Sequence, residues 1–135
     1  MSGPVTTQLF RIEGTVPPPD MLLVGQKGAV HTDIVKVVAT GELPRGTLLM
    51  PVDGGVWGPC TAAGLEEPRG FAILADSVTI GDDEWAEVAA YFEGDFNEAA
   101  VVFPWLEDEA DRPAALELAR EPLRQCKLFL RTVHE

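Results

Sequence analysis

Residues 85–92 read Trp-Ala-Glu-Val-Ala-Ala-Tyr-Phe, and their alternation decides the class of fold that we expect. Successive side chains of a β-strand point to opposite faces, so this stretch predicts a strand with one face in the core. One face would carry Ala86, Val88, Ala90 and Phe92, and the other Trp85, Glu87, Ala89 and Tyr91.

Further strands are predicted on both sides of this stretch, in apolar and β-branched runs bounded by glycine or proline. Residues 48–52 and 56–57 flank Asp53-Gly54-Gly55, which predicts a hairpin because glycines tolerate the positive φ of a tight turn. The other predicted strands are residues 8–12, 21–25, 34–39, 70–74, 99–103 and 126–133. We expect the strand at 70–74 to be buried on both faces, and Leu128 and Leu130 to face inward.

One short helix is predicted near the C-terminus. Asp111 can cap its start and Pro113 lies in its first turn, while Leu116, Ala119 and Leu123 recur at helical spacing. Pro122 lacks an amide hydrogen, so we expect a kink or a stop there. The expected fold class is therefore α+β and β-rich: a small mixed β domain with one short helix and an extended N-terminal arm.

The chain divides into an arm and one domain. Its 135 residues, 46% of them hydrophobic, suffice for one self-supporting core, which we place in residues 21–135. Residues 1–20 include Pro17-Pro18-Pro19, whose backbone favours polyproline II, and this predicts an arm. Residues 1–4 lack the basic and apolar start of a secretory signal, so we expect no export.

Acidic residues dominate the charge. The net charge is −12, and residues 66–111 hold fourteen acids against one base, Arg69. This balance repels phosphate backbones and anionic lipid, so we expect neither nucleic acid nor membrane as a partner. It leaves open an acidic DNA mimic, which would inhibit a nucleic-acid-binding protein. The default interpretation is that the acids lie in solvated loops that aid solubility.

Residues for catalysis or for metal binding are sparse. His31 and His134 lack ligand spacing, and no nucleophile motif or dinucleotide glycine pattern is present, so we expect no metal, no cofactor and no enzyme activity. A small hydrolase using Cys60 with His31, or a carboxylate pair, is the weaker alternative. We expect Cys60 and Cys126 to be free thiols.

Aromatic residues gather in the second half of the chain and include one candidate interface anchor. Trp105 follows Pro104 and precedes the acidic run 107–109, a position that is more often exposed than central. Because large aromatic side chains are enriched at protein interfaces, we name Pro104 and Trp105 as this anchor.

The order of the motifs over residues 44–133 resembles the head decoration proteins of phage lambda and its relatives. The segments that carry the resemblance are Val56-Trp57-Gly58, Gly70-Phe71-Ala72-Ile73-Leu74-Ala75, the aromatic-x-Gly-x-Phe turn at 92–96 within Tyr91-Phe92-Glu93-Gly94-Asp95-Phe96, and Val102-Phe103-Pro104-Trp105, followed by a short helix and a closing strand.

The resemblance implies a virion structural protein that sits as homotrimers on the outer surface of an expanded phage head and stabilises the major capsid protein lattice. Assembly would take place in the host cytoplasm. The N-terminal arm of that family orders on the coat and adds backbone pairing to coat strands. In this chain Leu9, Phe10 and Ile12 would be the capsid-binding residues of the arm.

Overall fold

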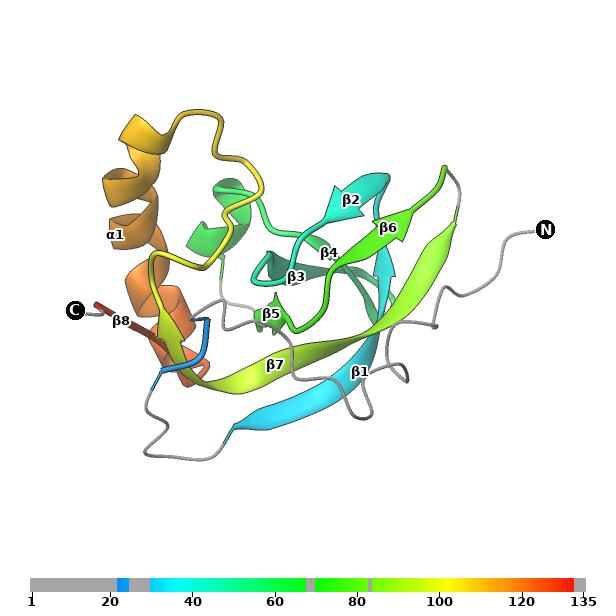
Figure 1. Ribbon diagram of the computed structural model, residues 1–135, viewed down its shortest axis with the longest axis horizontal. Helices are drawn as coiled ribbons and strands as arrows, with labels where there is room; N and C mark the ends of the chain where they lie inside the picture. Colours follow the sequence, from blue (N-terminus) through cyan, green and yellow to red (C-terminus); the bar gives the residue numbers. More distant parts are fainter. Residues whose placement is uncertain (1–21, 25–29, 68–69, 83, 133–135) are drawn as a thin grey trace.

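The protein is a strand-rich α+β fold in this computed structural model, as the sequence predicts. The structure describes residues 22–24, 30–67, 70–82 and 84–132 (Figure 1). Its elements are β1 (His31–Val38), β2 (Gly41–Leu43), β3 (Leu48–Asp53), β4 (Val56–Pro59), the 3₁₀ helix η2 (Ala63–Glu66), β5 (Ala72–Leu74), β6 (Val78–Ile80), β7 (Trp85–Asn97), the 3₁₀ helix η3 (Glu109–Asp111), α1 (Arg112–Gln125) and β8 (Leu128–Arg131).

The main sheet closes on itself. Its strand order is β1-β4-β3-β5-β7-β8, and β1 also pairs with β7, so the first five strands of that order form a ring. The antiparallel β1–β7 pairing runs along all of β1, whereas β1 and β4 meet in parallel at Val37 and Trp57. The ring therefore has a narrow seam between β1 and β4. Trp57, the β4 residue of this pairing, packs edge-on against the ring of Phe92 of β7, with centroids 5.4 Å apart, and both rings pack against the core.

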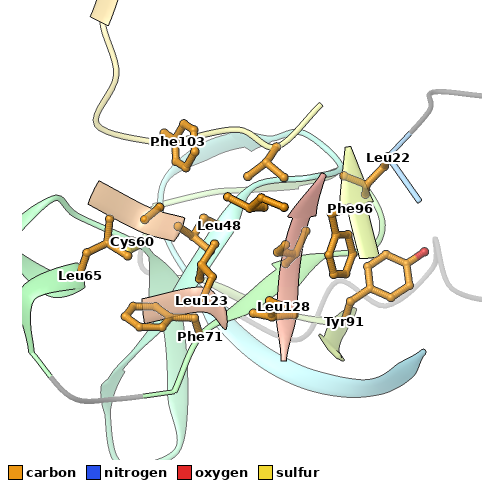
Figure 2. Packing of buried hydrophobic residues seen from close by; sticks show 14 of the residues in the cluster. Leu22, Leu48, Cys60, Leu65, Phe71, Tyr91, Phe96, Phe103, Leu123 and Leu128 are labelled. Atoms are coloured by element: carbon orange, nitrogen blue, oxygen red, sulfur yellow. The ribbon is translucent and has the colours of Figure 1, made fainter. Parts of the chain in front are cut away.

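Alternation along the strands divides the core into two layers. The inner layer contains small and β-branched side chains of β1, β5 and β7, such as Val37, Ala72 and Ala90, with Leu49 of β3. Their neighbours Leu48, Ile73 and Tyr91 belong to the other layer, together with Leu123 of α1 and Leu128 of β8. Figure 2 shows Leu48 and Tyr91 in this layer. Small side chains in the inner layer suit a narrow ring, because a closed sheet of few strands has little interior space.

Several sequence predictions are confirmed. The hairpin of β3 and β4 turns at Gly54 and Gly55, which have φ values of 48° and 83°. Every residue of β5 is buried, and Leu128 and Leu130 of β8 face inward. Cys60 and Cys126 are free thiols. The strand predicted at 34–39 is β1, which begins three residues earlier.

The predicted turn at 92–96 is wrong, because β7 continues through it to Asn97. Gly94, with a φ of 150°, lies within the strand, and β7 changes partner there: its first part pairs with β1 and β5, and residues 94–97 pair in parallel with β8. Figure 1 shows β7 running from the β6 side of the molecule to α1 and β8.

The predicted strand at 99–103 is also wrong. The Asn97 side chain accepts a hydrogen bond from the amide of Ala99, and the amide of Ala100 donates to the Asn97 carbonyl, so the chain turns there. A single bridge joins Val102 to Thr47. The apolar side chains of Val101 and Phe103 are buried by packing without a strand.

The N-terminal predictions fall partly outside the described residues. Of the strand predicted at 21–25, residues 22–24 are described, and they form an isolated bridge between Leu23 and Phe96. The arm (residues 1–20), the strand at 8–12 and the capsid-binding residues Leu9, Phe10 and Ile12 lie outside the described part. The short strands β2 and β6 were not predicted from sequence, and they pair with each other in a separate sheet.

The helix begins directly after Asp111 as predicted, but the predicted cap hydrogen bond is wrong, and so is a stop at Pro122. Asp111 occupies the cap position without a side-chain cap hydrogen bond. Asp108 serves instead, one turn earlier, where its carboxylate accepts from the amide of Ala110 and caps η3. Helix α1 runs through Pro122 to Gln125, because burial of Ala119 and Leu123 on its inner face holds the last turn against the core.

Candidate functional site

Pro104 and Trp105, the predicted interface anchor, lie where the chain leaves the core. Phe103 is buried, and the rings of Phe103 and Trp105 are 5.3 Å apart. Trp105 is half-buried and packs against the outer core layer. Trp105 is therefore held by the packed core, and the exposed part of its ring can contact a partner.

Trp105 lines a surface pocket of about 510 Å³ between the segment after Phe103 and helix α1. We call it the Trp105 groove, and its residues are Trp105, Leu106, Glu107, Asp108, Asp111, Ala114, Ala115 and Leu118. The apolar floor of the groove consists of one aromatic side chain, two leucines and two alanines. Leu118 is 37% exposed, so part of its side chain is open to solvent beside Trp105 and the two alanines of the groove.

Arg112 fixes the N-terminal end of the groove. Its guanidinium donates to the carbonyl oxygens of Val101 (2.9 Å) and Glu98 (3.3 Å) and to the Glu109 carboxylate (3.0 Å). It also lies over the ring of Phe103, 5.5 Å from the centroid. The first turn of α1 is thereby tied to the segment that carries Trp105, so the two walls of the groove are held at a set distance.

Glu98 and Arg120 fix the other half of α1. Arg120 donates to the Glu98 carboxylate at 2.6 Å and to the Leu130 carbonyl at 3.1 Å, and the Thr132 hydroxyl donates to Glu98 at 2.6 Å. These bonds join α1 and β8 to the end of β7. The Thr132 hydroxyl and then the Arg120 guanidinium hold the pKa of Glu98 below its ordinary value of 4.5.

We expect Glu98→Gln to lower the free energy of unfolding by about 1 kcal/mol at neutral pH. The effect is modest because Arg120 is partly exposed, and solvent weakens its charged hydrogen bond to Glu98. A folded-state pKa below the unfolded one contributes stability that is present above the unfolded pKa and lost as pH falls through the folded pKa. The difference in the free energy of unfolding between wild type and Glu98→Gln should therefore disappear as the pH falls through the folded-state pKa of Glu98. Urea unfolding from pH 7 to pH 3 measures it, and a pH-independent difference would contradict the assignment.

Three carboxylates line the groove together with its apolar residues. Glu107, Asp108 and Asp111 are exposed at its rim, and none of the described residues that line it is basic. The arrangement places an apolar contact surface beside three exposed carboxylates.

Sequence reasoning missed Leu118 and Leu106. The residues that recur at helical spacing are Leu116, Ala119 and Leu123, and of these Ala119 and Leu123 are buried. Leu118 lies off that stripe, one turn after Ala114, and an apolar residue on the predicted solvent side of an amphipathic helix was the available signal.

The residues weighed for catalysis lie in structural positions. Cys60 is 1% exposed, and its thiol contacts the Thr61 carbonyl oxygen at 3.3 Å, so a substrate has no access to the sulfur. His31 is exposed on β1, with its ring 6.1 Å from that of Phe92. Within the described ranges, no group of three His, Cys, Asp or Glu residues is placed to hold a metal ion.

Two other hollows are smaller. One, of about 410 Å³, lies between η2 and the end of α1 and includes Phe71 and Cys126. The other, of about 490 Å³, lies beside the seam, where the Lys36 ammonium is 4.3 Å from the centroid of the Trp85 ring. Neither combines an exposed leucine with a continuous acidic rim.

No protein-family model matches the chain, and a comparison with curated proteins finds no sequence match. Among the described residues, no helix has the length and apolar character to cross a membrane.

Proposed function

We propose that the chain is a structural capsid decoration protein, which binds as homotrimers to the major capsid protein on the outer surface of an expanded phage head. The observation that supports the proposal is the Trp105 groove, which contains Trp105 of the predicted interface anchor and is held to the core through Phe103. The resemblance of residues 44–133 to head decoration proteins is the reason for naming the major capsid protein as the partner.

The proposed action is mechanical and involves no turnover. A trimer presents three copies of each contact, so many weak contacts to neighbouring coat subunits act together against the outward pressure of packaged DNA. The arm, with Leu9, Phe10 and Ile12, would add backbone pairing to coat strands, and its ordering cost would be offset by these contacts.

The acidic DNA mimic is less well supported, because arginines interrupt the acidic surface. A mimic needs carboxylates spaced like phosphates on one unbroken face. Here several acids are neutralised locally, in the pairs Arg112–Glu109, Arg120–Glu98, Arg124–Glu121 and Arg131–Asp95.

Co-sedimentation with expanded heads that lack the protein tests the proposal. We expect saturable binding near one copy per coat subunit, as three-fold decoration requires, and loss of that binding when residues 1–20 are deleted. Unexpanded heads serve as the control for lattice specificity. An absence of saturable binding to expanded heads would overturn the proposal and direct attention to a nucleic-acid-binding partner.

A further inference from the structure

The apolar and acidic residues of the Trp105 groove limit what can bind in it. Its floor is apolar and includes the exposed part of Leu118, so covering it removes hydrocarbon surface from water. The charged groups that line it are all carboxylates, namely Glu107, Asp108 and Asp111. An occupant must therefore bring apolar surface to the floor and positive charge to the rim.

The nearby bases do not supply that positive charge. Arg112 directs its guanidinium to the Glu98 and Val101 carbonyls and to Glu109. Farther along α1, Arg120 is held by Glu98, and Arg124 by Glu121 at 2.6 Å. The rim carboxylates therefore remain available to cations from outside the molecule.

A second copy of this chain complements the rim poorly, since each copy carries a net charge of −12 and would bring more acid to an acidic surface. A different protein with a basic segment complements it well. The volume of about 510 Å³ suits one or two large apolar side chains with their flanking backbone.

We propose that the Trp105 groove binds a basic segment of the coat protein, which inserts a large apolar side chain between Trp105 and Leu118 while flanking Lys or Arg residues pair with Glu107, Asp108 and Asp111. The identity of the partner rests on the proposed function, and the chemistry of the segment rests on the groove itself. Salt then weakens the attachment, because the rim charges are exposed to solvent.

Peptide binding to the full-length chain tests the chemistry without phage heads. The probe is a blocked hexapeptide of alternating lysine and leucine, and its controls replace lysine by glutamate or leucine by serine. We expect the first peptide alone to shift the NMR signals of the Trp105 indole, Ala114 and Leu118. Shifts that lie elsewhere, or equal binding of all three peptides, would overturn the proposal.

Charge neutralisation tests the rim. The triple variant Glu107→Gln, Asp108→Asn, Asp111→Asn keeps an acceptor at the cap of η3, and we expect it to bind the probe about tenfold more weakly with a flatter salt dependence. The matched control Glu42→Gln, Asp82→Asn, Glu87→Gln changes the net charge equally at exposed sites outside the groove and should bind as wild type does. Equal weakening of both variants would overturn a specific rim.

Phage heads then identify the partner. We expect the rim variant and Leu118→Glu to bind expanded heads more weakly than the matched control, with their trimers intact by sedimentation. If wild type does not bind heads, the proposed function fails while the peptide result still decides the groove. If the rim variant and Leu118→Glu bind heads as well as the matched control does, the coat protein does not occupy the groove. If the trimers of these variants dissociate, a second copy of the chain occupies it. Either result would overturn the proposal.

Discussion

Replacing Phe96 with alanine is expected to destabilise the protein by about 3–5 kcal/mol, the range for removing a large aromatic side chain from a well-packed core. Phe96 is fully buried. Its strand segment pairs with β8 on one side and bridges Leu23 on the other, and its ring lies 5.5 Å from that of Tyr91 (Figure 2). The cavity would open where three chain segments meet, and the ladder hydrogen bonds around it limit collapse.

The matched control is Phe129→Ala on the neighbouring strand. Phe129 is half-buried, with the Arg131 guanidinium 5.2 Å from its ring, so its removal leaves a dent open to water and should cost about 1 kcal/mol. Urea unfolding followed by tryptophan fluorescence measures both variants. Similar losses for the two phenylalanines would show that the end of β7 is not the packing centre that we describe.

Replacing Gly46 with alanine is expected to have the second large effect. Gly46 has a φ of 97°, and a methyl group there would lie 2.6 Å from the carbonyl oxygen of Ala100. That oxygen is backbone and cannot rotate away. The Gly46 amide donates to Leu74 and its carbonyl accepts from Val102, so the segment cannot move without breaking contacts on both sides.

Gly41 separates the two causes of this effect. It has a similar φ of 105°, but a methyl group there would meet nothing within 4 Å. Alanine at either position carries a backbone cost of about 1–2 kcal/mol, and Gly46→Ala adds about 1–3 kcal/mol of overpacking. The difference between the two variants in thermal or urea unfolding measures the steric part. Equal losses would mean that the Asn97–Ala100 turn yields freely, contrary to the packing described above.

Local sequence signals predicted the elements whose conformation depends on near neighbours. The β3–β4 hairpin needs two successive positive φ values, and glycine at 54 and 55 supplies them without strain. The buried run of β5 and the alternation of β7 follow in the same way. The helix was predicted from the spacing of Ala119 and Leu123 and begins directly after Asp111 as expected, although the Asp111 side chain makes no cap hydrogen bond.

Pairing between distant segments could not be predicted in this way. Gly94 reads locally as a turn residue, but parallel pairing with β8, more than thirty residues later, keeps it in a strand. The run at 99–103 reads as a strand, but the Asn97 side chain turns the chain there and no neighbouring strand continues the ladder. Strands β2 and β6 are too short to give a periodic signal, and they exist through their mutual pairing.

The candidate site follows the same division. Trp105 was named from its place after Pro104 and before an acidic run, and the structure puts it beside Leu118 of α1, which no local pattern had connected with it. The fold class, the hairpin, the helix and the acidity could be predicted from the amino-acid sequence, because each depends on composition or on neighbours within a few residues. The closed ring, the full extent of β7 and the groove are visible only in the folded chain, since they arise where segments far apart in the chain exclude water together.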